Sequence, residues 1–325
     1  MADRRDDPSR LARSASPTPV PLRIPSDSRE STGRIVRFRS QDGLQLAARV
    51  FDAKGAERLP LLCLPGLSRN SRDFALLGRF FSQHADEPRK VVALDYRGRG
   101  LSDADPDWRN YTTSVEAQDV LAAAAVLGVE RAIIVGTSRG GIIAMLLGAL
   151  RPGLLAGVVL NDIGPVLEAT GLARIKKYLS AKRTIKSWDD AVAVMRDIGG
   201  RQFPALAEED WREVTEAYFV ETQAGLAPQF DPNLIRIVEN IDLTEKIPVL
   251  WPQFASLAAV PLLAVRGALS DILSPRTLAE MSERHPLMES LVVAGQGHPP
   301  TLADPATLER VFAFVQHRAT CTTAE

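Results

Sequence analysis

Six short apolar runs, each three or four residues long, recur along this chain between stretches with helical spacing. None alternates apolar with polar residues, as a strand with one face in solvent would. Such runs are typical of strands that are buried on both faces of a mostly parallel sheet. They lie at residues 61–64, 91–94, 132–135, 158–160, 262–265 and 291–293. These six runs therefore predict the central strands of one sheet.

Helical patterns separate many of these runs, notably at residues 115–127, 139–150 and 306–316. Alternating strands and helices form βαβ units, so the chain is predicted to be an α/β protein with a doubly wound sheet. Ahead of the first run, residues 34–38 and 44–51 have strand character, and Asp42-Gly43 between them can supply a turn with positive φ. We expect these two strands to add an antiparallel start to the sheet.

The alternation stops after Gly164 and resumes near Pro261. The segment between these residues has the spacing of several amphipathic helices, including residues 173–179, 188–195 and 209–222. We therefore predict an α/β core formed by residues 34–164 and 248–318, interrupted by a helical cap at residues 165–247.

The two ends of the chain lack such patterns. Residues 1–33 are rich in Arg, Asp, Ser and Pro and have neither helical nor strand periodicity. A stretch of this kind buries too little apolar surface to offset the entropy lost on ordering. We expect a disordered leader at residues 1–33 and a short tail at residues 319–325.

The composition argues against several classes of partner. The chain has 39 Lys and Arg residues against 40 Asp and Glu residues, so its net charge of -1 offers no general attraction to nucleic acid or acidic lipid. It contains no run of 18 apolar residues that would span a membrane, and no signal peptide is apparent. With only two cysteines a disulfide framework is not expected, and a cytoplasmic location fits best.

The most informative motif is Gly-Thr-Ser-Arg-Gly at residues 136–140, between the apolar run 132–135 and the helical pattern that begins at Arg139. A strand that turns sharply into a helix needs small residues on both sides of the serine, so that the backbone can pass close to its neighbours. The turn lifts the hydroxyl of Ser138 clear of the sheet. The motif therefore predicts a serine nucleophile.

In this context the sequence resembles the α/β-hydrolase family over residues 34–318. Two further motifs support the resemblance: Leu64-Pro65-Gly66-Leu67 is similar to the family's oxyanion loop, and residues 95–102 are similar to its Asp-x-Arg-Gly-x-Gly-x-Ser stretch. The family often has His where Pro65 stands. The resemblance implies an α/β-hydrolase fold with a helical cap.

A serine hydroxyl needs a base to remove its proton, and the base needs a carboxylate to orient it. Of the four histidines, only His298 lies late in the chain on a loop that follows a predicted strand. The family's order of serine, acid and histidine implies that the acid lies between Ser138 and His298. Asp271, after the run 262–265, is the preferred acid, and Asp162, after the run 158–160, is the alternative.

The resemblance also implies that the backbone N-H groups of Leu67 and Arg139 stabilise the oxyanion that forms during acyl transfer. For the side chain of Arg139 we favour a structural ion pair over contact with substrate. Large aromatic residues of the predicted cap are candidates for the substrate pocket, among them Trp188, Trp211 and Tyr218.

These residues predict a serine hydrolase that cleaves a carboxylic ester or lactone through an acyl-enzyme intermediate. The same side chains would also support a C-C bond hydrolase or a cofactor-free perhydrolase. A non-catalytic small-molecule receptor with this fold is the alternative from another class. The sequence contains no metal-ligand cluster, P-loop or dinucleotide-binding motif, so we expect no metal or cofactor and a small ester-like molecule as partner.

Overall fold

The computed structural model describes residues 33–319 apart from residues 56–57, 182, 244 and 246. The predicted leader and tail lie almost entirely outside these described residues. Eight strands form one sheet in the order β1-β2-β4-β3-β5-β6-β9-β10. Their bounds are β1 Arg34–Arg39, β2 Gln45–Phe51, β3 Leu61–Leu64, β4 Val91–Asp95, β5 Ala132–Thr137, β6 Leu155–Asn161, β9 Leu262–Gly267 and β10 Met288–Val293.

The pairing of the strands confirms the predicted fold class. Strands β3, β4, β5, β6, β9 and β10 are parallel to their neighbours among themselves, whereas β1 pairs with β2 and β2 with β4 in antiparallel register. The five inner parallel strands, β3, β4, β5, β6 and β9, are buried along their whole length, because helices cover both faces of the sheet. The unalternating apolar runs of the sequence are these strands.

Two apolar clusters fill the space on either side of the sheet. Helices α2 (Thr113–Val126), α3 (Arg139–Leu150), α8 (Trp251–Ala255) and α9 (Pro275–Arg284) contribute to the larger cluster. Helices α1 (Ala75–Ser82) and α10 (Pro305–Ala319) contribute to the other, where Phe314 is fully buried. The helices therefore lie on both faces, as a doubly wound sheet requires.

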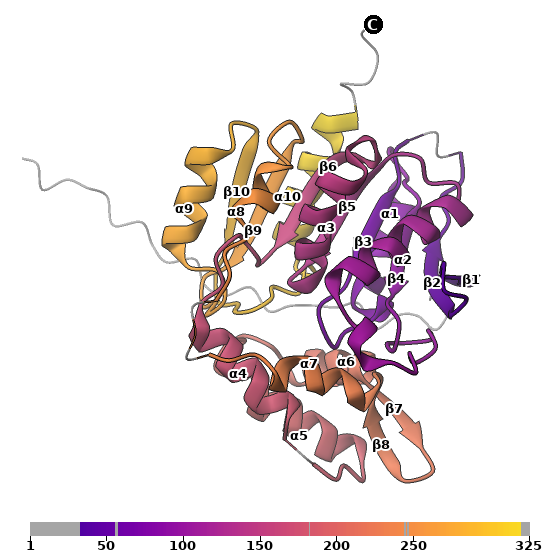
Figure 1. Ribbon diagram of the computed structural model, residues 1–325, viewed down its shortest axis with the longest axis vertical. Helices are drawn as coiled ribbons and strands as arrows, with labels where there is room; N and C mark the ends of the chain where they lie inside the picture. The colour runs from indigo at the N-terminus through magenta and orange to yellow at the C-terminus, as the bar shows by residue number, and fades with distance from the viewer. Residues whose placement is uncertain (1–32, 56–57, 182, 244, 246, 320–325) are drawn as a thin grey trace, which may run out of the picture.

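The segment between β6 and β9 forms a separate layer, drawn below the sheet in Figure 1. It contains helices α4 (Ala169–Leu179), α5 (Trp188–Gly199), α6 (Glu208–Tyr218) and α7 (Ile235–Glu239), and a hairpin of β7 (Phe219–Thr222) and β8 (Gly225–Pro228). We call residues 165–247 the insertion.

The hairpin corrects one prediction. The helix expected at residues 209–222 ends at Tyr218, and residues 219–222 pair with residues 225–228 instead. Gly225 makes this turn possible because it adopts a φ of +111°, which residues with a side chain rarely adopt, and an added Cβ would lie 2.7 Å from the carbonyl oxygen of Ile185.

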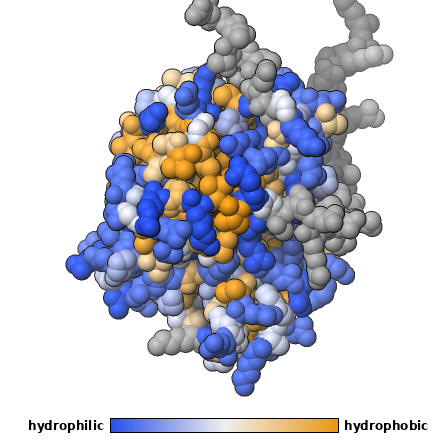
Figure 2. Space-filling view, turned by 90° about the vertical axis from the view of Figure 1, so that its right-hand side faces the viewer, coloured by the Kyte–Doolittle hydropathy of each residue, from blue (hydrophilic) through white to orange (hydrophobic). Residues whose placement is uncertain are grey.

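Figure 2 shows the molecule from the side on which β1 lies in Figure 1. Hydrophilic side chains cover much of this face and surround an apolar patch in its upper half. Within the described part of the chain, no helix has the length and apolar character needed to cross a membrane.

Candidate active site

Ser138 lies in a sharp turn between β5 and α3. Its φ of +51° is rare for a residue with a side chain, and the turn depends on the two glycines that flank it. A Cβ on Gly136 would lie 2.6 Å from the carbonyl oxygen of Gly140, and one on Gly140 would lie 2.1 Å from that of Leu64. Because no side chain fits at these contacts, the local sequence dictates the conformation that presents the serine.

Ser138, His298 and Asp162 form a hydrogen-bonded relay. The Oγ atom of Ser138 lies 2.9 Å from Nε2 of His298, and Nδ1 of His298 lies 2.8 Å from Oδ2 of Asp162. With a proton on Nδ1, the imidazole donates to the carboxylate and its Nε2 accepts the serine proton. Asp162 is fully buried and His298 is 8% exposed, so water competes little for these bonds.

The expected position of Asp271 beside His298 needs correction. Oδ2 and Oδ1 of Asp271 accept hydrogen bonds from Nε and Nη2 of Arg174, at 2.7 and 2.9 Å. Asp162 follows β6, which lies between the strand of Ser138 and β9, and its Oδ1 accepts the N-H of Gly267 at 2.8 Å. The carboxylate that faces the imidazole therefore comes from the middle strand, and Arg174 holds Asp271.

Burial on its own would raise the pKa of Asp271, but hydrogen bonds from Arg174 and Gln202 outweigh it and hold the pKa below the usual range. The nearby imidazole of His298 acts in the same direction. Asp271 therefore keeps its charge in the mildly acidic range and remains available to these donors.

Gln202 is a contact that the sequence analysis missed. It lies in the insertion between α5 and α6, and its Oε1 accepts the backbone N-H of His298 at 2.7 Å. Gly297 makes room for this contact, because a Cβ there would lie 2.4 Å from Cβ of Gln202. Gly297 in the Gly-Gln-Gly-His sequence was the one available signal that another segment approaches this loop.

The loop that contains Leu67 lies beside Ser138, since a Cβ on Gly66 would be 4.0 Å from Cβ of Ser138. The carbonyl oxygen of Leu67 accepts a hydrogen bond from Nε of Arg99 at 2.9 Å, which fixes its peptide unit. The second predicted backbone donor, Arg139, directly follows Ser138 at the N-terminus of α3. Both predicted donor residues thus adjoin the serine.

The side chain of Arg139 makes structural contacts, the alternative that the sequence analysis favoured. Its Nε donates to Glu116 at 2.6 Å, and its Nη2 donates to the carbonyl oxygen of Tyr111 at 2.8 Å. Glu116 is fully buried and also forms an ion pair of 2.8 Å with Arg99. One buried carboxylate therefore links the arginine that fixes Leu67 to the arginine that follows Ser138.

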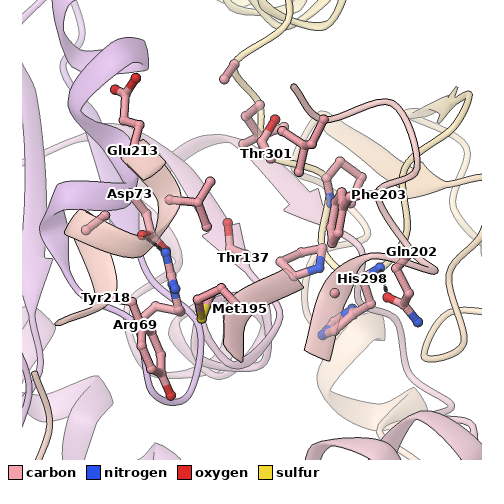
Figure 3. A pocket seen from close by; sticks show the side chains of 18 of the residues that line it. Arg69, Asp73, Thr137, Met195, Gln202, Phe203, Glu213, Tyr218, His298 and Thr301 are labelled. Carbon is pink, nitrogen blue, oxygen red and sulfur yellow. Dashed lines mark hydrogen bonds and ion pairs between the residues drawn. The ribbon is translucent and has the colours of Figure 1, made fainter. Parts of the chain in front are cut away.

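A cavity of about 220 Å³ lies between His298 and the insertion. In Figure 3, Gln202, Phe203 and His298 lie on one side of it, and Arg69, Asp73 and Tyr218 lie on the other. Its apolar lining comes largely from α1, α5 and α6 and from the loop after His298, and includes Leu76, Met195, Ile198, Trp211, Val214 and Leu302.

Two of the three predicted pocket aromatics, Trp211 and Tyr218, line this cavity. The third, Trp188, is a further correction, because it is absent from the lining. Its indole N-H donates to Glu221 at 2.8 Å, and its ring packs against Arg212 instead. Among the described residues, no cluster of three or more His, Cys, Asp or Glu side chains could hold a metal ion.

Comparisons with known proteins agree with this geometry. Residues 61–311 match the sequence model of the "Alpha/beta hydrolase family". The chain is 34% identical to a "3-hydroxybutyrate-oligomer hydrolase" of Cupriavidus necator over 260 residues, which cover 76% of this chain and 85% of the relative. It is 26% identical to a "2-(acetamidomethylene)succinate hydrolase" of Mesorhizobium japonicum over 69% of this chain and 78% of the relative.

Among solved structures, an alpha/beta hydrolase from Novosphingobium aromaticivorans superposes with a TM-score of 0.81 at 33% identity. The match covers 88% of this chain and 99% of that chain. The similarity therefore extends over nearly the whole of the other protein, including the region of the insertion.

Proposed function

Because the chain belongs to the alpha/beta hydrolase family and is an enzyme with hydrolase activity, we propose that it is a serine hydrolase acting on carboxylic esters or lactones. Ser138 is the nucleophile, His298 the general base and then acid, and Asp162 the carboxylate that orients His298. The observation that carries the proposal is the relay of two hydrogen bonds, 2.9 and 2.8 Å long, that joins these side chains.

In the first half of the reaction, Oγ of Ser138 attacks the ester carbonyl carbon while Nε2 of His298 takes the serine proton. The carbonyl oxygen gains a negative charge, which the N-H groups of Leu67 and Arg139 stabilise, and loss of one such donor typically costs about 3 kcal/mol. The tetrahedral intermediate then collapses, the C-O bond to the alcohol breaks, and His298 gives its proton to the leaving alkoxide. The products of this half are an alcohol and an acyl-Ser138 ester.

In the second half, His298 takes a proton from water, and the resulting hydroxide attacks the acyl carbon. Collapse of the second tetrahedral intermediate breaks the bond to Oγ, and His298 returns the proton to Ser138. The carboxylic acid leaves and the enzyme is regenerated. Asp162 keeps its charge throughout and stabilises the imidazolium formed in each half.

The insertion acts as a cap over this site in the proposed mechanism. It supplies one wall of the cavity, and Gln202 from the insertion accepts the N-H of His298. The relative from Cupriavidus necator supports an ester substrate, because the bond between two hydroxy acid units in an oligomer is an ester.

A fluorophosphonate probe tests the proposal, because it reacts with an activated serine without requiring a matched substrate. We expect labelling of Ser138 in the native protein and none in Ser138→Ala or after denaturation. A parallel panel of p-nitrophenyl esters, lactones and hydroxy acid oligomers should be turned over by the native protein alone. A native protein that is not labelled and hydrolyses none of these compounds would contradict the proposal.

A further inference from the structure

Five polar side chains with N-H or O-H donors line the cavity together: Ser68, Arg69, Arg174, Tyr178 and Tyr218. We call them the donor belt. Ser68 directly follows Leu67, one of the proposed oxyanion donors, so the belt begins next to the reacting bond. The rest of the lining is mainly apolar, which makes a group of donors a specific feature of the cavity and not a general property of its surface.

Hydroxyl groups form the middle of the belt. Ser68 hydrogen-bonds Tyr178 of α4 and Tyr218 of α6, so both phenols reach from the insertion to the loop beside Ser138. Burial raises the pKa of both phenols. They therefore keep their protons at neutral pH and remain donors.

Guanidinium groups form the two ends of the belt. Arg69 lies 4.9 Å from the ring centre of Tyr218 and is bonded to Asp73 through Nε and Nη2, at 2.7 and 2.5 Å. Arg174 is bonded to Asp271 in the same way. In each pair the aspartate occupies one edge of the guanidinium, which leaves the N-H bonds of Nη1 for another acceptor.

Tyr178 lies within electrostatic reach of both arginines. Its hydroxyl therefore marks a position between two cations where an acceptor meets donors from several directions. The side chains of Arg69 and Arg174 are only 21% and 26% exposed, so solvent screens such an interaction weakly. The other two charged lining residues, Arg72 and Glu213, have opposite formal charges and add no net charge.

Resting on the proposed function, we propose that the donor belt binds a carboxylate carried by the ester substrate, and that Arg69, Arg174 and Tyr178 determine this specificity. A carboxylate suits the belt because its two oxygens can accept from a guanidinium and a phenol at once. A phosphate dianion suits it less, since each arginine already shares its charge with an aspartate. The enzyme thus distinguishes an anionic ester from a neutral ester of the same shape.

Matched substrates test this specificity. Ethyl hydrogen succinate and ethyl succinamate differ only in a carboxylate or carboxamide on the acyl side, and 3-butanoyloxybutanoate and its amide differ in the same way on the alcohol side. Released ethanol or butyrate reports turnover. We expect kcat/KM for the carboxylate member of at least one pair to exceed that of its amide by about tenfold or more.

Arg69→Met should reduce this preference to about threefold or less, while kcat/KM for the amide changes by less than about threefold. Tyr178→Phe, which removes only a hydroxyl, should reduce the preference by a smaller factor. Arg212→Met is the matched control: Arg212 also pairs with an acidic residue four positions on, Glu216, and lies 5.2 Å from the ring centre of Trp188, but does not line the cavity. It should keep the full preference.

Equal turnover of carboxylate and amide in both pairs, with Ser138 still labelled by fluorophosphonate, would overturn the donor belt and leave the proposed function standing. An Arg69→Met variant that loses amide and carboxylate turnover equally would also overturn it, because the role of Arg69 would then be structural. Absence of both turnover and labelling would reject the two proposals together.

Discussion

The sheet and the insertion contribute to the same site by different means. The sheet is held by strand pairing and by two apolar clusters, and it carries Ser138, Asp162 and His298 at the ends of its strands. The insertion has a much smaller apolar cluster, centred on Ile185, Ala191, Tyr218 and Phe219. Many of its contacts with the core near the site are polar instead.

These polar contacts fall into two groups. On one side Arg174 binds Asp271 and Gln202 binds the N-H of His298, mainly through side chains. On the other side the backbone N-H groups of Gly100 and Asp231 donate to the carbonyl oxygens of Gln229 and Gly98 at 3.0 and 2.7 Å. The comparison teaches that the core determines the chemistry, whereas the insertion tunes the position of His298 and the choice of substrate.

The largest expected effect separates the two aspartates. Asp162→Asn should lower kcat by about 10⁴-fold, because an amide in place of the carboxylate no longer holds the imidazole in the productive tautomer. Asp271→Asn should lower kcat by only about tenfold, since Asp271 acts on His298 through Gln202. Steady-state kinetics on one ester, with circular dichroism of both variants, checks the ranking. The reverse order would return the acid role to Asp271.

A second, smaller effect should come from the insertion alone. Gln202→Leu removes the acceptor of the His298 N-H, and we expect kcat to fall by about tenfold with KM changed by less than about threefold. Gln223→Leu, an exposed change in the β7-β8 turn, is the control and should leave both constants unchanged. An unaltered kcat in Gln202→Leu would show that the insertion does not position His298.

The serine and histidine positions could be predicted because each depends on a local pattern that follows a strand. The two aspartates could not be separated in this way, since both follow strands that end at the same edge of the sheet. The deciding contact joins Asp271 to Arg174, 97 positions away in the sequence. Gln202 meets His298 across 96 positions, and no local pattern encodes such a pairing.

The same distinction explains the secondary structure. The buried strands were predicted to within a few residues, because packing on both faces demands continuous apolar runs. The helix expected at residues 209–222 was too long, because pairing of residues 219–222 with β8 depends on the turn at Gly225 and competes with helical spacing. In the insertion, tertiary contacts therefore outweigh local propensity.

A third effect concerns pH and should be seen in stability. The pKa of Asp271 is depressed in the folded protein, so its hydrogen bonds stabilise the fold above the unfolded-state pKa of about 4. This contribution disappears as the pH falls through the folded-state pKa. The native protein should exceed Asp271→Asn in free energy of unfolding by about 1 kcal/mol at pH 7. Urea titrations at descending pH should show the difference shrinking below pH 4; a constant difference would contradict the account.

The smallest effect is expected at Trp188, which belongs to the insertion but does not line the cavity. Trp188→Ala should change kcat/KM for any ester by less than about twofold, because only the contacts with Glu221 and Arg212 are lost. Trp211→Ala, within the lining, is the comparison and should change the ranking of substrates by acyl size. Equal effects of the two variants would mean that the cavity is not where substrate binds.

The most direct measurement of the central claim is mass spectrometry of the enzyme quenched by acid during ester turnover. The account predicts an acyl group on the peptide that contains Ser138, present in the native protein and absent from Ser138→Ala. An acyl group on another residue, or unchanged turnover by Ser138→Ala, would contradict it.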